Sequence, residues 1–129
     1  MKRLLISLLV LLNSLNVVNS SNLYNQKELI VTSESTRESI ELAKYLNDYG
    51  VVKYSAYWCP NCLNQSELFG RQAYKELNEV ECARDGLNSQ TKLCIDKKIK
   101  GFPTWEINGK LILGVLSLKE LSKLTGFKN

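Results

Sequence analysis

Apolar residues are unevenly distributed along the chain, and the first cluster lies at its amino terminus. Residues 1–3 include two basic side chains and precede a mostly apolar run over residues 4–12. A basic start followed by a short apolar run is typical of a secretory signal. The run is shorter than the ~20 residues that span a membrane. The pattern predicts a signal peptide over residues 1–20, with an uncleaved N-terminal anchor as the alternative. It also predicts a linker over 21–30 and one domain over 31–129.

Further along, apolar residues recur at helical spacing. The first predicted helix covers about residues 36–49. It begins at a capping box, in which Ser35 and Glu38 satisfy free backbone amides. Gly50 follows, at the place where a left-handed residue commonly ends a helix.

Three more helices are predicted in the rest of the chain. A long one covers residues 63–78 and is weakened or bent at Gly70. A short one covers residues 88–98. The last begins at a second capping box, formed by Ser117 and Glu120. The residues of the last helix predicted to face inward are Leu118, Leu121 and Leu124.

Runs of β-branched and aromatic residues predict strands between these helices. The predicted strands cover residues 51–57, 79–82, 102–107 and 111–113, with a further edge strand at 29–31. Asn108 and Gly109 separate the last two strands and predict a hairpin with a type I′ turn. Alternating strands and helices imply parallel pairing, to which the hairpin adds an antiparallel edge. The order of elements therefore predicts an α/β fold with a mixed sheet.

The composition excludes several kinds of chemistry. The 129 residues include no His, so a Ser-His-Asp or Cys-His nucleophile cannot be assembled, and neither can a His-based zinc site. The formal net charge of +4 is small and evenly spread, which argues against a nucleic-acid partner. We predict no metal and no organic cofactor. The remaining candidate chemistry belongs to the four cysteines, which are Cys59, Cys62, Cys82 and Cys94.

Cys59 and Cys62 directly follow a predicted strand and are separated by only two residues. Pro60 suits the first position of a helix, which makes Cys59 the N-cap residue. Free backbone amides and the positive end of the helix dipole would then stabilise a thiolate at Cys59. Cys62 lies one turn later and is less exposed. We therefore predict that Cys59 is the nucleophile of thiol–disulfide exchange and that Cys62 is the resolving cysteine.

Two other interpretations of these cysteines remain open. Cys59 and Cys62 could form a purely structural disulfide, although so small a loop restricts the unfolded chain little. All four cysteines could bind zinc. Against this second interpretation, Cys82 and Cys94 lie twelve residues apart and do not form another C-x-x-C pair.

The motifs resemble those of a known superfamily. Trp-Cys-Pro-Asn-Cys after a strand, a later Phe-Pro-Thr, and a closing hairpin and helix resemble the thioredoxin superfamily over about residues 30–127. A more specific likeness comes from five segments taken together. The segments at 56–62, 67–70, 81–82, 88–91 and 101–109 resemble the thioredoxin-like domain fused to bacterial, notably cyanobacterial, vitamin K epoxide reductase homologues.

This resemblance implies a thioredoxin fold with a cis proline beside the active site. Pro103 would be the cis residue, and Phe102 would present backbone groups to an extended substrate. Without the resemblance, a proline on an edge strand is an equally good interpretation. Asn61 stands where the fused family often has His, so one electrostatic contribution to a thiolate is missing.

The resemblance also implies a function and partners. In the fused family this domain takes electrons from substrate thiols and passes them to a membrane-embedded quinone reductase. We therefore expect an exported, monomeric thiol–disulfide oxidoreductase in the periplasm or thylakoid lumen. It would oxidise client proteins and work with a separate membrane partner of the vitamin K epoxide reductase type. A disulfide reductase or isomerase is one alternative, and a non-catalytic binding or assembly factor is another.

Lys53 occupies the position, six residues before the first cysteine, that thioredoxins fill with a buried acid. A cation near the pair would favour a thiolate and a more oxidising disulfide. The alternative is that Lys53 extends to solvent.

The resemblance implies that Cys82 and Cys94 are bonded to each other in a structural role. A shuttle pair that exchanges electrons with the first two cysteines is the alternative. Trp58 is predicted to be exposed, in an aromatic docking patch with Tyr57, Phe102 and Trp105. For Tyr57 and Trp105 taken singly, a place in the strand core is the alternative.

Overall fold

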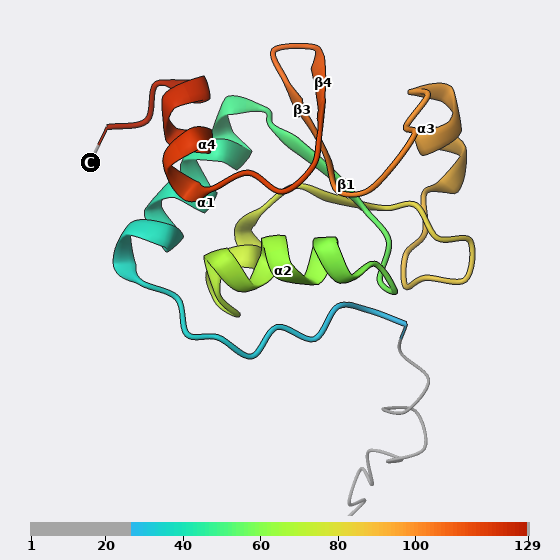
Figure 1. The fold of residues 1–129 in the computed structure, drawn as a ribbon, viewed down its shortest axis with the longest axis horizontal. Coiled ribbons are helices and arrows are strands. Elements are labelled where there is room, and N and C mark those ends of the chain that lie inside the picture. The colour runs from blue at the N-terminus through green and yellow to red at the C-terminus, as the bar shows by residue number, and fades with distance from the viewer. Residues whose placement is uncertain (1–26, 129) are drawn as a thin grey trace, which may run out of the picture.

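A four-stranded mixed sheet forms the centre of the molecule, as the computed structural model, which describes residues 27–128, shows (Figure 1). The strands lie in the order β2–β1–β3–β4. Their bounds are Val52–Ser55 for β1, Glu79–Glu81 for β2, Thr104–Ile107 for β3 and Lys110–Leu113 for β4. β1 and β2 are parallel, and β3 is antiparallel to both β1 and β4. Together with the helices around it, this sheet confirms the predicted α/β class and thioredoxin fold.

The turn between β3 and β4 has the predicted type I′ geometry. Asn108 has a φ of 51° and Gly109 a φ of 75°, which are the two positive values that this turn requires. The turn sets the register of the hairpin, so that Ile107 pairs with Lys110 and Thr104 with Leu113.

Successive side chains along each strand point to opposite faces of the sheet, and paired residues on neighbouring strands share a face. We call the face that carries Lys53, Ser55, Trp105 and Ile107 the first face. The second face carries Val52, Tyr54, Val80, Thr104, Glu106, Leu111 and Leu113. Most of the core lies on the first face, where Trp105 and Ile107 pack with residues of α1 (Arg37–Tyr49) and α4 (Leu118–Thr125).

The predictions for α1 and α4 are correct except for the N-cap of α1 and the inward face of α4. The N-cap of α1 is Thr36, whose hydroxyl accepts from the Ser39 amide, so the predicted capping box at Ser35 is wrong. The box at Ser117 and Glu120 is present. Leu121 is fully buried, but Leu124 is 45% exposed and was wrongly predicted to face inward.

The predicted long helix is in fact two separate elements. α2 covers Pro60–Phe69, and a 3-10 helix, η2, covers Ala73–Glu76. Gly70 ends α2 with a φ of 87°, and a Cβ added there would lie 2.5 Å from the Ser35 amide nitrogen. The Ser35 hydroxyl accepts hydrogen bonds from the amides of Gln72 and Ala73. The chain therefore turns here because the segment before α1 passes close to it.

Residues 27–35 lie along α2 in an extended conformation (Figure 1). The edge strand predicted at 29–31 is wrong, because this segment pairs with no strand of the described sheet. Leu29 and Val31 are nevertheless buried. Glu67 of α2 holds the segment by accepting from the amides of Thr32 and Ser33, at 2.8 Å each.

α3 covers only Thr91–Asp96, which is shorter than the predicted helix. Asn88 and Lys98, which were the predicted ends, have φ values of 53° and 58° and are therefore not helical. Among residues 27–128, no helix has the length and apolar character needed to cross a membrane. The predicted signal peptide and most of the predicted linker lie outside the described residues.

Candidate active site

Cys59 is the N-cap residue of α2, and Pro60 is the first residue of the helix. The Cys62 amide donates to the Cys59 sulfur at 3.3 Å. The sulfur therefore satisfies one of the amides that a helix start leaves free. Cys59 is 7% exposed and Cys62 is fully buried, so Cys59 is the sulfur that a substrate can reach. Pro60 and Asn61 between them are both exposed.

Burial, which is the largest cause, and the hydrogen bond with Cys59 together raise the pKa of the Cys62 thiol to about 12. The Ala56 backbone and the charge of Lys53 act in the opposite direction and lower the pKa of Cys62. At neutral pH the free Cys62 is therefore a protonated thiol, which suits a resolving cysteine better than an attacking one.

A loop with a cis peptide bond faces the cysteine pair. The bond between Phe102 and Pro103 is cis, as the resemblance implies. The Cys59 thiol donates to the Phe102 carbonyl oxygen at a sulfur–oxygen distance of 3.6 Å. Trp58 packs edge-on against the Phe102 ring, with the ring centroids 6.1 Å apart, and it is 60% exposed. The Cys59 sulfur thus lies between the start of α2 and the Phe102 backbone, with the exposed Trp58 indole nearby.

Lys53 is fully buried, so the interpretation that its side chain extends to solvent is wrong. Its ammonium donates to the Ser66 hydroxyl of α2 at 2.7 Å. It also lies 2.5 Å from Glu79 Oε2, as an ion pair that lacks hydrogen-bond geometry. A cation therefore lies beneath the cysteine helix, as predicted. The sequence analysis did not single out Glu79, the partner of this cation. The negative charge of Glu79 offsets part of the effect that Lys53 was expected to have on the cysteines.

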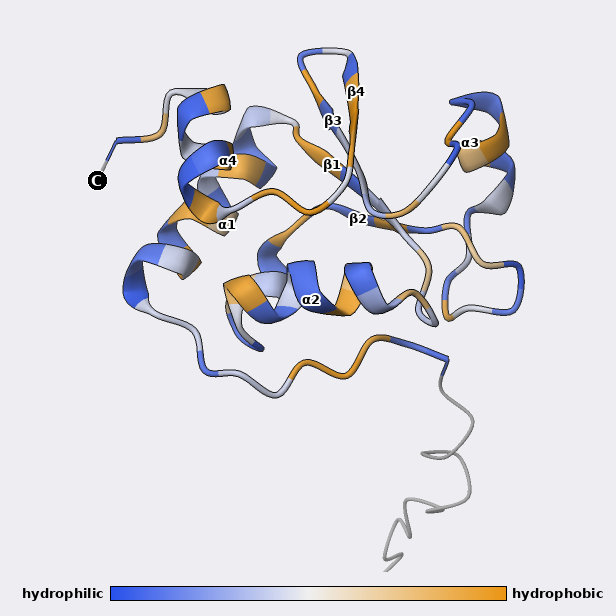
Figure 2. Cartoon of the chain, viewed as in Figure 1, coloured by the Kyte–Doolittle hydropathy of each residue, from blue (hydrophilic) through white to orange (hydrophobic). Residues whose placement is uncertain are grey.

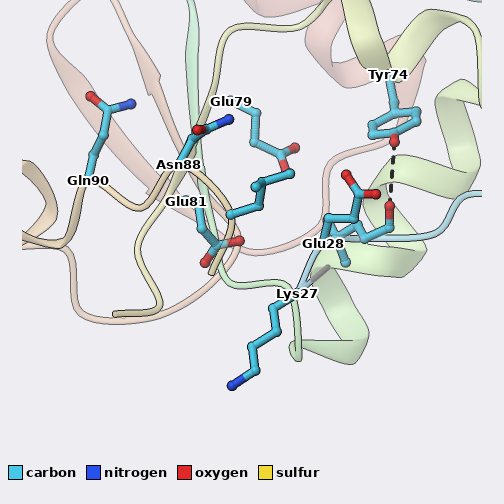
Figure 3. Close-up of a pocket in the computed structure, with 9 residues that line it drawn as sticks. Lys27, Glu28, Tyr74, Glu79, Glu81, Asn88 and Gln90 are labelled. Atoms are coloured by element: carbon cyan, nitrogen blue, oxygen red, sulfur yellow. Dashed lines mark hydrogen bonds between the residues drawn. The ribbon is translucent and has the colours of Figure 1, made fainter. Parts of the chain in front are cut away.

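Glu79 connects this buried cation to a small surface cavity. The cavity has a volume of about 220 Å³ and lies beside β2, as Figure 3 shows. Glu28, Glu79 and Glu81 contribute carboxylates to its lining. On the opposite wall the Tyr74 hydroxyl donates to the Leu29 carbonyl oxygen at 3.4 Å. Since the Glu79 side chain is 23% exposed and Lys53 is not exposed at all, the ion pair meets solvent only through Glu79.

Cys82 and Cys94 form a disulfide, which is the pairing implied by the resemblance. The bond joins the end of β2 to α3 and packs with Tyr54 and Val80 on the second face of the sheet. Because both sulfurs are used, the four cysteines cannot share one zinc ion. Within residues 27–128 no cluster of His, Cys, Asp or Glu could hold a metal ion.

The other two aromatic residues of the predicted patch, Tyr57 and Trp105, differ in burial. Trp105 is fully buried in the core, which agrees with the alternative interpretation for this residue. Tyr57 lies beyond the end of β1, half-buried, and its hydroxyl donates to Asp85 at 3.2 Å. Burial therefore removes Trp105 from the predicted docking patch, in which Trp58 is exposed and Tyr57 and Phe102 are half-buried.

Leu29 is a site residue that the sequence analysis missed. It packs in one buried cluster with Ala56, Cys59, Cys62 and Ala83. Its neighbours in the sequence carry no motif, so the only available signal was the short apolar run at 29–31. By covering the cysteines, Leu29 contributes to the burial that raises the pKa of Cys62.

Known proteins similar to this chain include a plant oxidoreductase. No model of a known protein family matches the chain. Over 100 residues, which are 75% of this chain, it is 50% identical to the thiol-disulfide oxidoreductase LTO1 of Arabidopsis thaliana. The match spans only 27% of that relative. The fold, the cysteine pair at the start of α2 and this likeness together identify the chain as a member of the thioredoxin-like superfamily.

Proposed function

We propose that this chain is a thiol–disulfide oxidoreductase in which Cys59 is the nucleophile and Cys62 the resolving cysteine. The observation that carries the proposal is the unequal environment of the two sulfurs. Cys59 accepts a helix amide and is partly accessible, whereas Cys62 is fully buried with a raised pKa. The likeness to a protein named as a thiol–disulfide oxidoreductase supports the same activity.

The proposed reaction with a client dithiol takes two exchange steps. In the oxidised protein a client thiolate attacks the Cys59 sulfur, and Cys62 leaves as a thiolate that takes up a proton from solvent. The second client thiolate then attacks the client sulfur of this mixed disulfide and expels Cys59. The client is oxidised to a disulfide, and the protein ends with two reduced cysteines.

We further propose that the chain works in the oxidising direction in the periplasm or thylakoid lumen. It would pass electrons to a membrane-embedded quinone reductase of the vitamin K epoxide reductase type. The buried Lys53 supports an oxidising pair because a cation near the thiols favours the reduced, thiolate form. The pairing of Lys53 with Glu79 weakens this support, and it is the observation that favours a reductase or isomerase instead.

Trapping mixed disulfides tests the activity itself. In a Cys62→Ala variant, Cys62 can no longer attack the mixed disulfide on Cys59 in the reverse of the first step, so client proteins should accumulate on Cys59 in cells. A Cys59→Ala variant is the matched control and should trap none. Equal trapping by the two variants, or none by either, would contradict the assignment of Cys59 as nucleophile.

The reduction potential and the redox state in cells test the direction. We expect a potential clearly above the roughly −270 mV of thioredoxin and a mostly oxidised cysteine pair in the cell. A potential at or below that value, with a mostly reduced pair, would instead favour the reductase. A pair that does not react with an alkylating agent after mild reduction would indicate a non-catalytic binding factor.

A further inference from the structure

The two faces of the sheet are covered unequally by helices. On the first face, α1, α2 and α4 cover the core around Trp105. On the second face, α3 and its disulfide cover Tyr54 and Val80. Past α3, no described helix covers the hairpin. Leu111 and Leu113 of β4 are therefore 44% and 63% exposed. Figure 2 shows β4 as an apolar strand at the edge of the molecule.

A groove of about 230 Å³ runs between β4 and the segment that leads from α3 to the cis proline. Gly101 is one of its lining residues, and a Cβ added there would come within 2.9 Å of the Leu113 side chain. We call it the β4 groove. Its lining residues are Lys98, Ile99, Lys100, Gly101, Thr104, Leu111 and Leu113.

The lining of the β4 groove is basic as well as apolar. It contains two lysines and no acidic residue. Lys98 and Lys100 are exposed and form no ion pair with any residue in 27–128. The neighbouring Lys97, by contrast, is paired with Glu106 at 2.7 Å. The groove therefore combines a leucine wall with two unneutralised positive charges.

The backbone at Lys98 is costly for a lysine. Its φ of 58° lies in the left-handed region, where glycine or asparagine would fit with less strain. The backbone amide of Lys98 donates to the Ile95 carbonyl oxygen at the end of α3. A glycine at this position could make the same hydrogen bond. Strained positions of this kind are concentrated at functional sites. Folding alone does not explain a lysine here, but a role for its charge would.

The groove adjoins the candidate active site along the chain. Gly101, which lines the groove, directly precedes Phe102, whose carbonyl oxygen is 3.6 Å from the Cys59 sulfur. β4 is an edge strand, and its outer side is not paired with any described strand. An extended chain that reaches Cys59 past Phe102 could thus continue along β4, where backbone groups are free to bind it.

We propose that the β4 groove binds an extended segment of the client protein that combines apolar and acidic residues. Apolar side chains pack on Leu111 and Leu113, and carboxylates pair with Lys98 and Lys100. The groove therefore selects which thiols react at Cys59. This inference rests on the proposed function, since it presumes that clients exchange disulfides at that sulfur.

The test compares two peptide dithiols that differ only in charge. Each peptide has two cysteines and a tract in which leucine alternates with glutamate in one peptide and with lysine in the other. Both peptides are made in two versions, with the tract on the amino side or on the carboxyl side of the cysteines. Stopped-flow fluorescence of the tryptophans follows the reduction of the oxidised protein. For at least one placement we expect the glutamate peptide to react about tenfold faster at low salt, with a smaller difference at high salt.

A double variant, Lys98→Glu with Lys100→Glu, should abolish or reverse this preference. The ratio of the two peptide rates within one variant cancels any general change in thiol reactivity. Lys44→Glu with Lys123→Glu is the matched control, because these exposed lysines on α1 and α4 carry the same charge change away from the groove. The control should keep the wild-type ratio.

Three results would overturn the proposal. Equal rates for the two peptides with the wild-type protein would show that the groove does not select acidic segments. An equal loss of preference in both double variants would show that net charge, not the groove, sets the ratio. Failure of the oxidised protein to react with dithiothreitol would contradict the proposed function itself, and this inference with it.

Discussion

Lys53 is a charged residue that is completely buried, although lysine side chains normally extend to solvent. A fully buried ammonium is stable only with partners, and here these are Ser66 and Glu79. Replacing Lys53 by Met leaves Glu79 without its counter-charge. We expect Lys53→Met to lower the free energy of unfolding by about 2 kcal/mol. This is less than the ~3–5 kcal/mol of a fully buried pair, because Glu79 is partly exposed. Urea denaturation measures the change.

The double variant Lys53→Met with Glu79→Gln is the control for this prediction. It removes both charges, so most of the lost stability should return. If Lys53→Met alone is as stable as the wild type, the ion pair contributes nothing. If the double variant is no better than the single one, lost packing at Lys53 rather than the unpaired charge is the cause.

Glu67 makes stability depend on pH. Hydrogen bonds from Ser33 and Thr32 lower the pKa of its carboxyl to about 2 in the folded protein, from ~4.3 when unfolded. A depressed folded pKa stabilises the protein above pH ~4.3, and this stabilisation is lost as the pH falls toward 2. The variant Glu67→Gln should therefore lose less stability than the wild type between pH 5 and pH 2. Denaturation curves across that range measure the difference.

Glu38→Gln serves as the reference for the acid dependence of Glu67. Glu38 is exposed in the first turn of α1 and makes no hydrogen bond to residues 27–35 through its side chain. This variant should follow the wild-type acid curve. An unchanged acid slope in Glu67→Gln would mean that its contacts with Thr32 and Ser33 do not stabilise the fold.

At the scale of elements, Gly70 decides where α2 ends. Its φ is 87°, and a Cβ there would meet the Ser35 backbone at 2.5 Å. Gly50, at the end of α1, has nearly the same φ of 86° but nothing within 4 Å of its Cβ position. Gly50→Ala should cost only the left-handed strain of ~1 kcal/mol. Gly70→Ala should cost on the order of 3 kcal/mol, because the backbone must also move. Thermal unfolding of the two variants distinguishes strain from collision, and equal losses would contradict the close approach.

The same glycine shows what sequence patterns can and cannot predict about elements. The four main strands, the C-terminal end of α1 and both ends of α4 follow from β-branched and aromatic runs, turn residues and caps, which are local signals. The break after Phe69 and the extended run at 29–31 depend on contacts between segments about 35 residues apart. An apolar run such as Leu29 to Val31 is compatible with a strand or with a segment packed on a helix. Only the packing against α2 decides between them.

The candidate site divides in a similar way. The positions of Cys59, Pro60 and Cys62 at a helix start could be predicted because capping chemistry is local. The burial of Lys53, its pairing with Glu79 and the cover supplied by Leu29 could not. Each joins residues from different segments, and the register of β1 with β2 is what brings Lys53 opposite Glu79. Sequence therefore identifies the candidate reacting sulfurs, and the fold sets their electrostatic surroundings.

At the scale of the whole molecule, the Cys82–Cys94 disulfide lies apart from the candidate active site. It lies on the second face of the sheet, packed with Tyr54 and Val80, in a cluster that contains neither Cys59 nor Cys62. Closing a loop of this size contributes about 3 kcal/mol, chiefly by restricting the unfolded chain. Replacing both cysteines by Ser should therefore lower the free energy of unfolding by about that amount and leave the rate with dithiothreitol unchanged. Loss of that rate in a variant of unchanged stability would instead make the second pair an electron shuttle for the first.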